Sequence, residues 1–326
     1  MQITPLVWFI TIAVTIAFFV FEFFAHVRKP HEPTIAESAR WSVFYIGLAV
    51  LFGVGIGLVS GWDFGGEYFA GYLTEKALSI DNLFVFLIIM TGFAVPKAYQ
   101  QKVLLIGIVI ALIMRGAFIW AGAALLENFS WTFYLFGALL LVLAWRQVSG
   151  DHTPDPTKNL FVRITRRLLP VTDEYHGDKL TVKRDGTRFV TPMLLTIVAI
   201  GFVDLIFAID SIPAIYGLTE EAYIVFTANA FALMGLRQLY FLVGGLLERL
   251  VYLAQGLAVI LAFIGVKLLF HALHVNELPF INGGQHVEWA PEIPIWFSLT
   301  FIAVTIAVAT VASLAKTRKD RAAIVE

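Results

Sequence analysis

The sequence predicts an all-α fold: a polytopic helical membrane protein with about nine transmembrane helices, six of which form two inverted three-helix repeats. Three observations predict this fold. Of the 326 residues, 59% are hydrophobic and 14% are charged, whereas about 25% are charged in a typical soluble domain. Apolar runs of about 20 residues, enough to cross a bilayer, recur along the chain. The charged residues inside these runs recur in the same order in both halves.

Composition also excludes several classes of function. The chain contains no cysteine, which excludes disulfides, thiol redox chemistry and cysteine-ligated metal sites. Its net charge of −1 gives no sign of a nucleic-acid partner. The apolar N-terminal segment lacks basic residues at its start, so we interpret it as an uncleaved first span. We therefore expect a membrane protein in contact with the lipid bilayer, without a prosthetic group and not an enzyme, with a redox role left open.

The predicted spans divide the chain into five regions. Residues 1–67 hold two helices and a cytoplasmic loop, and 68–147 and 192–274 hold one repeat each. Between the repeats, 148–191 form a cytoplasmic loop, and 275–326 contain an outer loop, a last helix and a basic tail. The predicted spans are 6–26, 42–60, 68–94, 103–126, 130–147, 192–216, 222–246, 252–274 and 293–315.

Lysine and arginine predict how the chain is oriented. Basic residues fall in every second connection and are scarce in the others, which carry acidic residues instead. Because cytoplasmic loops are enriched in basic residues, we expect the N-terminus outside and the C-terminus in the cytoplasm of a bacterial-type inner membrane. The basic residues outside the central loop include Arg28, Lys29, Arg40, Lys97, Lys102, Arg249, Lys316, Arg318, Lys319 and Arg321.

The cytoplasmic loop ends in KLTVKRDGTRFVTP, which alternates around Asp185-Gly186. An Asp-Gly pair between alternating segments is typical of a two-residue β-hairpin turn. We therefore expect a small hairpin that leads into the sixth span.

The ionisable residues within the spans form two similar sets. In EKALSIDN and DLIFAIDS an acid is followed six residues later by an aspartate and then by an amide or hydroxyl. The next span holds one central arginine, and the span after that ends in a basic residue. The sets are Glu75, Asp81, Asn82, Arg115 and Arg146 in the first repeat, and Asp204, Asp210, Ser211, Arg237 and Lys267 in the second.

An odd number of spans per unit orients the two units in opposite directions. Inverted repeats are common in secondary transporters, and their ion sites lie where the repeats meet. Carboxylate, amide and hydroxyl oxygens suit hard divalent cations such as Mg²⁺, Ca²⁺ or Mn²⁺. Pro213 favours an opened helix beside Asp210, where a freed carbonyl adds another oxygen. The sequence therefore predicts a cation site built from both sets.

Charge balance is consistent with that site. The four acids exceed Arg115 and Arg237 by about two charges, enough to accept one divalent cation or two protons. These arginines and Lys267 would balance the acids when the site is empty. The alternative is a permanent buried salt-bridge network that only fixes helix packing.

Two weaker signals accompany this set. His271, His274 and Glu277 have helical spacing at the outer end of the eighth span. They suggest an outer release site for a metal, although histidines are common at membrane interfaces. Asn229, in FTANAFALM, is an apolar-span amide that either joins the second repeat's site or stabilises a helix contact.

Several longer motifs resemble the TerC family. These are LSIDNLFVF, DLIFAIDSIPAI, GLRQLYFLVGGLLERLVYL and GLAVILAFIGVKLL, and the resemblance extends from about Gly66 to His274. It implies export of Mn²⁺, with Glu75, Asp81, Asn82, Asp204, Asp210 and Ser211 at the motif positions. The outward direction of transport comes from this resemblance alone. Other members are described as membrane-bound redox modulators or linked to membrane-protein assembly, and these functions stay open as alternatives.

Overall fold

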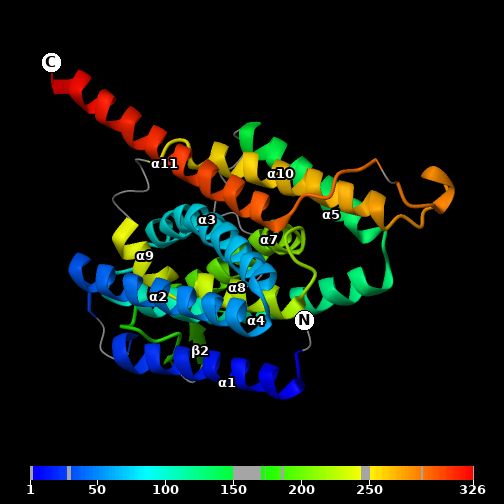
Figure 1. Cartoon of the computed structure of the whole chain (residues 1–326). Helices are drawn as coiled ribbons and strands as arrows, with labels where there is room; N and C mark the ends of the chain where they lie inside the picture. Colours follow the sequence, from blue (N-terminus) through cyan, green and yellow to red (C-terminus); the bar gives the residue numbers. More distant parts are fainter. Residues whose placement is uncertain are drawn as a thin grey trace.

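A bundle of long helices makes up most of the protein (Figure 1). The computed structural model describes residues 3–27, 31–149, 170–172, 174–184, 187–243, 250–287 and 289–325. The longer helices are α1 (Pro5–Glu22), α2 (Ile35–Ser60), α3 (Trp62–Gly92), α4 (Lys97–Asn128), α5 (Thr132–Ser149), α7 (Pro192–Tyr216), α8 (Ala222–Leu233), α9 (Leu236–Val243), α10 (Leu253–His274) and α11 (Ile295–Val325). The shorter elements are the π-helix η1 (Phe23–Val27), strands β1 (Thr181–Arg184) and β2 (Thr187–Val190), and the 3₁₀-helix η4 (Asn282–Gly284).

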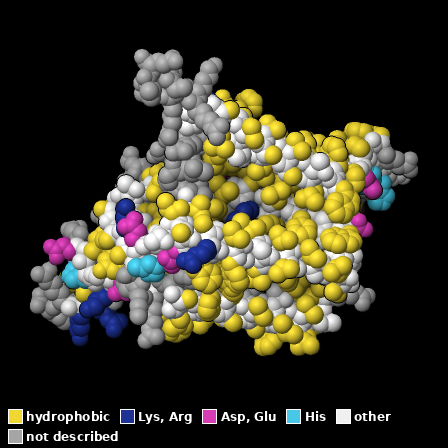
Figure 2. Space-filling view, turned by 60° about the vertical axis from the view of Figure 1, so that its left-hand side comes forward, with side chains coloured by type: hydrophobic (Ala, Val, Ile, Leu, Met, Phe, Trp, Pro, Cys, Tyr) yellow, Lys and Arg dark blue, Asp and Glu magenta, His cyan; other side chains and the backbone are white. Residues whose placement is uncertain are grey.

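The chain is an integral, multi-pass membrane protein. Within the described residues, eight helical segments are long and apolar enough to cross a membrane, with the 222–242 segment counted as one. The 31-residue α3 is also long enough to cross, but it carries charged residues at positions 63, 67, 75, 76 and 81. Figure 2 shows the consequence on the surface: hydrophobic side chains cover much of the visible face, and charged side chains gather toward its ends.

The two ends of the chain lie at opposite ends of the bundle. In Figure 1, α1 begins near one end of the long axis and α11 extends past the other. An odd number of membrane crossings places the two termini at opposite ends. The eight apolar segments together with α3 would give such an odd number.

Helix α3 lies at the centre of the bundle and packs against α2, α7, α8, α10 and α11 (Figure 1). Small residues allow these close approaches. A methyl group at Gly71 would lie 3.2 Å from Cγ2 of Ile215 and 3.3 Å from Cβ of Ala228. On another face, Gly66 lies near Trp296 of α11. The helix that carries the first acidic set is therefore enclosed by protein rather than by lipid.

Both helices with acidic sets are unbroken, which corrects the expectation that Pro213 opens its helix. Helix α7 continues through Pro213 and ends three residues later at Tyr216. Proline removes the hydrogen bond to the carbonyl four residues earlier, that of Ile209. Because Pro213 lies in the last turn, the rest of the helix keeps its hydrogen bonds.

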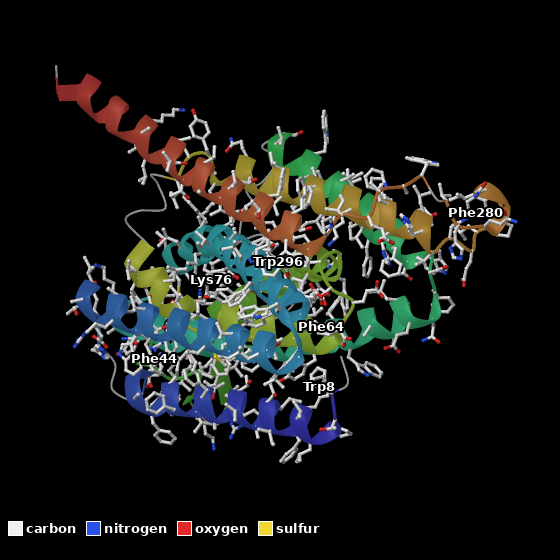
Figure 3. The ribbon with its side chains drawn as sticks, viewed as in Figure 1. Trp8, Phe44, Phe64, Lys76, Phe280 and Trp296 are labelled. Atoms are coloured by element: carbon white, nitrogen blue, oxygen red, sulfur yellow. The ribbon has the colours of Figure 1, made fainter. Side chains whose placement is uncertain are left out.

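The helix break lies instead in the segment predicted as one span over 222–246. Helix α8 ends at Leu233, Gly235 adopts a φ of +78°, and α9 begins at Leu236. From α3, Lys76 Nζ donates hydrogen bonds to the carbonyl oxygens of Ala232 (3.0 Å) and Met234 (3.5 Å). Figure 3 shows Lys76 among the helices of the bundle interior. Lys76 of α3 thus binds carbonyls released by the break between α8 and α9.

The described part of the 148–191 loop is attached to the protein near the connection between α3 and α4. Strands β1 and β2 pair antiparallel and flank residues 185 and 186, which lie outside the described residues. Tyr175 donates from its hydroxyl to the Phe93 carbonyl oxygen at 2.7 Å, at the end of α3. Lys102 of α4 forms an ion pair with Asp178, with Nζ and Oδ2 2.7 Å apart. The loop therefore folds back onto the α3–α4 connection.

Candidate functional site

A fully buried arginine connects the two acidic sets. Arg115 of α4 has no exposed surface, and its guanidinium donates to Glu75 of α3 and to Asp204 of α7. The contact with Asp204 is bidentate: Nε lies 2.9 Å from Oδ2, and Nη2 lies 3.2 Å from Oδ1. Nη1 also donates to Ser211 Oγ at 3.1 Å. Three side chains predicted as ligands, from both motif helices, thus meet at one guanidinium.

Local helix geometry explains why these residues meet. Asp204 and Ser211 are seven residues apart on α7, about two turns, and therefore share one face. That face meets α4 at the level of Arg115. On α3, Ser79 donates to Glu75 Oε1 at 3.3 Å from the next turn of the same helix. The Arg115 cluster, defined as Arg115, Glu75, Asp204 and Ser211, contains two carboxylates against one guanidinium. Its formal charge is therefore −1 when both carboxylates are ionised.

The second acid of each set lies outside this cluster. Asp81 accepts a hydrogen bond from Gln147 Nε2 of α5 at 3.0 Å. Asp210 is partly buried and lies within electrostatic range of Arg115 and Glu75. Asn82 is buried on α3, two turns beyond Glu75. The six-residue spacing points Asp81 about 120° away from Glu75, and the unbroken helix keeps that separation.

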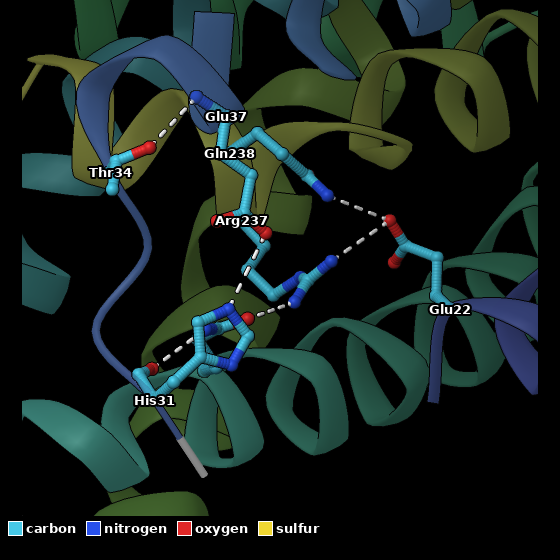
Figure 4. Close-up of polar contacts among 7 residues, drawn as sticks. Glu22, His31, Thr34, Glu37, Arg237 and Gln238 are labelled. Atoms are coloured by element: carbon cyan, nitrogen blue, oxygen red, sulfur yellow. Dashed lines mark hydrogen bonds and ion pairs between the residues drawn. The ribbon is translucent and has the colours of Figure 1, made fainter. Parts of the chain in front are cut away.

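Arg237 occupies a different environment, shown in Figure 4. It lies two residues after the break at Gly235 and pairs with Glu22 of α1, with Nη2 and Oε1 3.4 Å apart. The same Glu22 oxygen accepts hydrogen bonds from Tyr45 (2.6 Å) and Gln238 (3.0 Å). Arg237 also donates to the Gln101 side chain of α4. The Arg237 cluster, defined as these five residues, thus connects α1, α2, α4 and α9.

Lys267 lines a cavity of about 300 Å³ where α3 begins and α7 and α10 end. Glu67, Glu220 and His271 line the same cavity, and Lys267 lies within electrostatic range of Glu67. His271 Nε2 is 2.9 Å from Glu220 Oε1, and this close contact holds the pKa of Glu220 below the usual value. Lys267 therefore faces the acids of this cavity.

The three residues considered for an outer release site have separate partners. His271 pairs with Glu220, whereas His274 lies 3.9 Å from Glu292. Glu277 accepts a hydrogen bond from Ser130 Oγ at 2.9 Å. In the 300 Å³ cavity, His271 lies with Glu67 of α3 and with Glu220 of the loop after α7. His274 and Glu277 do not line this cavity.

The described residues contain no group of three or more His, Asp or Glu side chains placed to hold a metal ion. The oxygen donors that do converge are two carboxylates and a hydroxyl around Arg115. In this conformation the guanidinium takes the place where a cation would neutralise them. Such a site can exchange a cation for Arg115 only if the carboxylates move relative to the guanidinium.

Sequence reasoning missed two charged residues inside the bundle, one buried and one partly buried. Glu22 interrupts the apolar run VFEFF inside the predicted first span, 6–26, and it is 2% exposed. Lys76 directly follows Glu75, but it does not recur in the second motif, where Leu205 follows Asp204. An unpaired charge inside an apolar run was the available signal in both cases.

Comparison with known proteins identifies the family. The model described as "Integral membrane protein TerC family" matches residues 60–321. An uncharacterized membrane protein of Mycobacterium tuberculosis is 48% identical over 96% of this chain and 80% of its own length. The membrane-bound redox modulator Alx of Photorhabdus laumondii is 39% identical over 74% and 78%, respectively. A thylakoid membrane protein TERC of Arabidopsis thaliana is 41% identical over 75% and 65%.

No solved structure matches the chain. The family match covers most of the sequence, including both acidic sets and the helix that carries Arg115. The relatives confirm the resemblance carried by the motifs. The chain belongs to the TerC family of integral membrane proteins.

Proposed function

We propose that the protein exports divalent cations, with Mn²⁺ as its substrate, by alternating access. The observation that carries this proposal is the Arg115 cluster, where acids from both motif helices meet one buried guanidinium. Intramembrane acids that face the bundle interior are typical of ion pathways. The excess carboxylate gives the cluster a negative charge that a cation can neutralise. The preference for Mn²⁺ and the outward direction rest on the family resemblance.

We propose that the cluster works by exchange between the cation and Arg115. In the conformation described, Arg115 holds Glu75 and Asp204. A divalent cation that enters would compete for these carboxylates, and Asp210 and Asp81 would supply further charge as α3 and α7 shift. Protonation of the acids on the return step would couple export to proton entry. The break between α8 and α9 supplies a hinge next to α3.

The inverted-repeat arrangement is part of this proposal. A two-fold relation would exchange α3 with α7, α4 with α8–α9, and α5 with α10. Under that exchange the α4–α7 contact maps onto the α3–α8 contact, and both are present. The α3–α7 and α5–α10 contacts map onto themselves and are present too. A site between α3 and α7 would therefore lie on the pseudo-two-fold axis, where transporters of this type bind their ions.

Mn²⁺ flux into proteoliposomes tests this function. We expect the wild-type protein to move Mn²⁺, and Glu75→Gln, Asp81→Ala and Asp210→Ala to reduce the initial rate at least about tenfold. Asp63→Asn is the matched control, because Asp63 is an exposed acid at the start of the same helix α3. Wild-type rates in all three well-folded variants would refute the proposed site.

Orientation in the membrane is testable in a chain without cysteine. We propose that the N-terminus and the 276–294 loop face outward and the hairpin loop faces the cytoplasm. Phe280→Cys lies in the outer loop and Glu174→Cys in the hairpin loop, and both positions are exposed. An impermeant maleimide should label Phe280→Cys in intact cells and Glu174→Cys only after lysis. The opposite labelling would refute the orientation that we propose.

A second candidate is redox modulation, after which the Alx relative is named. The chain has no cysteine, so this function would act without thiol chemistry of its own. Expression of Glu75→Gln separates the two candidates. If the cellular redox state still changes when Mn²⁺ flux is lost, redox modulation is the better description.

A further inference from the structure

A buried apolar layer lies directly beside the Arg115 cluster. Val225 of α8 packs in one cluster with Ile119 of α4 and with Ile212 and Ile215 of α7. Gly71 of α3 approaches Ile215 at the same level. Residues of α3, α4, α7 and α8 therefore meet in one layer. The faces that carry these residues are the faces that point into the bundle.

One helical turn further along each helix, the residues are polar. Arg115, Ser211 and Glu75 lie four residues from Ile119, Ile215 and Gly71, respectively. Arg115 donates hydrogen bonds to the other two. From Val225 the same four-residue step leads to Asn229, because residues four apart share a helix face. These four-residue intervals run toward the C-terminus on α3 and α8 and toward the N-terminus on α4 and α7. This is expected if α3 and α8 run in the opposite direction to α4 and α7.

A second contact fixes the direction in which Asn229 points. Phe226, three residues before Asn229, lies 3.8 Å from the position of a methyl group at Gly116 of α4. Gly116 is adjacent to Arg115 in sequence. Residues three apart also share a helix face, so Asn229 faces α4 at the level of Arg115.

The amide of Asn229 is fully buried, and neither its oxygen nor its nitrogen has a hydrogen-bond partner among the described residues. Glu75 Oε2, at the same level, also lacks a partner there. Buried polar atoms are nearly always paired, so each such atom in a native fold calls for an unseen partner. An amide oxygen and a carboxylate oxygen are both donors that suit hard cations.

We propose that Asn229 is a further ligand of the transported cation, which its amide oxygen binds together with Glu75 Oε2 in the Arg115 layer. The proposal rests on the proposed function and extends it. It adds to the site a ligand from α8, the helix that ends at the break before Gly235. The negative charge of the Arg115 cluster favours a cation over an anion at this point. Movement of α8 at Gly235 would then change the distance between the two ligands.

Binding of Mn²⁺ to the purified full-length protein tests this ligand. Asn229→Leu keeps the side-chain size and removes the oxygen, so we expect the Kd for Mn²⁺ to rise at least about tenfold. Asn229→Asp adds a carboxylate and should lower the Kd. The fraction of free Mn²⁺ measured by electron paramagnetic resonance gives the Kd directly, without a transport assay.

Thr227→Val is the matched control, because Thr227 is a buried polar residue of the same helix. Its hydroxyl donates to the Tyr223 carbonyl oxygen at 2.8 Å, within α8. We expect wild-type affinity in this variant. The melting temperature without metal should be unchanged or higher in Asn229→Leu, since the substitution removes two unpaired buried atoms. The rise in melting temperature on adding Mn²⁺ should be smaller in Asn229→Leu than in the wild-type protein.

The outcomes separate this inference from the proposed function. If the wild-type protein binds Mn²⁺ and Asn229→Leu and Asn229→Asp bind it equally well, Asn229 contacts only water and the inference is wrong. If Asn229→Leu does not fold, an unchanged Kd in Asn229→Asp has the same meaning. If the wild-type protein does not bind Mn²⁺ at millimolar concentrations, the proposed function and this inference both fail.

Discussion

The two buried arginines occupy equivalent places in the two halves of the sequence but have different surroundings. Arg115 lies on an unbroken helix and contacts two carboxylates, one from each acidic set. Arg237 follows a helix break and contacts one carboxylate, that of Glu22. The Arg115 cluster is therefore one negative charge in excess, whereas the Arg237 cluster is neutral.

This difference separates a candidate binding site from a structural connection. In the Arg237 cluster, a single carboxylate oxygen accepts hydrogen bonds from Arg237, Gln238 and Tyr45. Such a carboxylate is already neutralised and has little to gain from a cation. In the Arg115 cluster a second carboxylate shares the guanidinium. The same substitution, glutamate to glutamine, made once in each cluster tests whether this distinction is correct.

The largest expected effect is on stability, from Glu22→Gln. It leaves Arg237 buried without a carboxylate, so we expect the free energy of unfolding to fall by about 3–5 kcal/mol. Glu75→Gln leaves Arg115 paired with Asp204, so the expected loss is about 1 kcal/mol. The melting temperature followed by tryptophan fluorescence measures both, since the chain contains 8 tryptophans.

Transport should show the reverse order. Per folded molecule, Glu22→Gln should keep its Mn²⁺ flux within about twofold of wild type, whereas Glu75→Gln should lose about tenfold or more. Initial rates in proteoliposomes, normalised to folded protein, measure this. Equal losses of flux in both variants would mean that the clusters do not differ in function.

A smaller effect is expected at the helix break. A methyl group at Gly235 would lie 2.7 Å from Cδ2 of Tyr45, and the φ of +78° disfavours residues other than glycine. We expect Gly235→Ala to lower the free energy of unfolding by about 1–3 kcal/mol. Gly47→Ala is its control, because Gly47 is helical with nothing within 4 Å of the added methyl group. Because Tyr45 donates to Glu22, the damage should fall on the Arg237 cluster.

The smallest effect is expected at the docked loop. The hydrogen bond from Lys102 holds the pKa of Asp178 below its ordinary value. The ion pair therefore stabilises docking above the ordinary pKa of about 4, and this stabilisation is lost as the pH falls through the lowered pKa. Because the pair is partly exposed, it contributes less than about 1 kcal/mol.

Asp178→Asn should therefore speed tryptic cleavage of the hairpin at neutral pH by at most about fivefold. Glu174→Gln, in the same loop, is the control. Equal cleavage rates in Asp178→Asn and the wild-type protein would show that the loop is held by Tyr175 and apolar contacts instead.

The sequence alone determined the class of the fold and the identity of the family. Apolar runs need only length and composition to be recognised, because a bilayer imposes a minimum helix length. The same patterns singled out Glu75, Asp204, Ser211 and Arg115, which the structure brings together. Charges inside apolar runs are costly, so their positions carry information even without a structure.

Only the tertiary structure decided which acid meets which arginine. The same order of ionisable residues in the two halves of the sequence made Arg115 and Arg237 look equivalent, but Glu22 of α1 pairs with Arg237. The position of the helix break was also decided in three dimensions. The helix tolerates Pro213 near its end, whereas Gly235 adopts a positive φ beside Tyr45 and Lys76 binds the nearby carbonyls. Pairing of buried charges depends on which helices are neighbours, and the order of residues along the chain does not specify those neighbours.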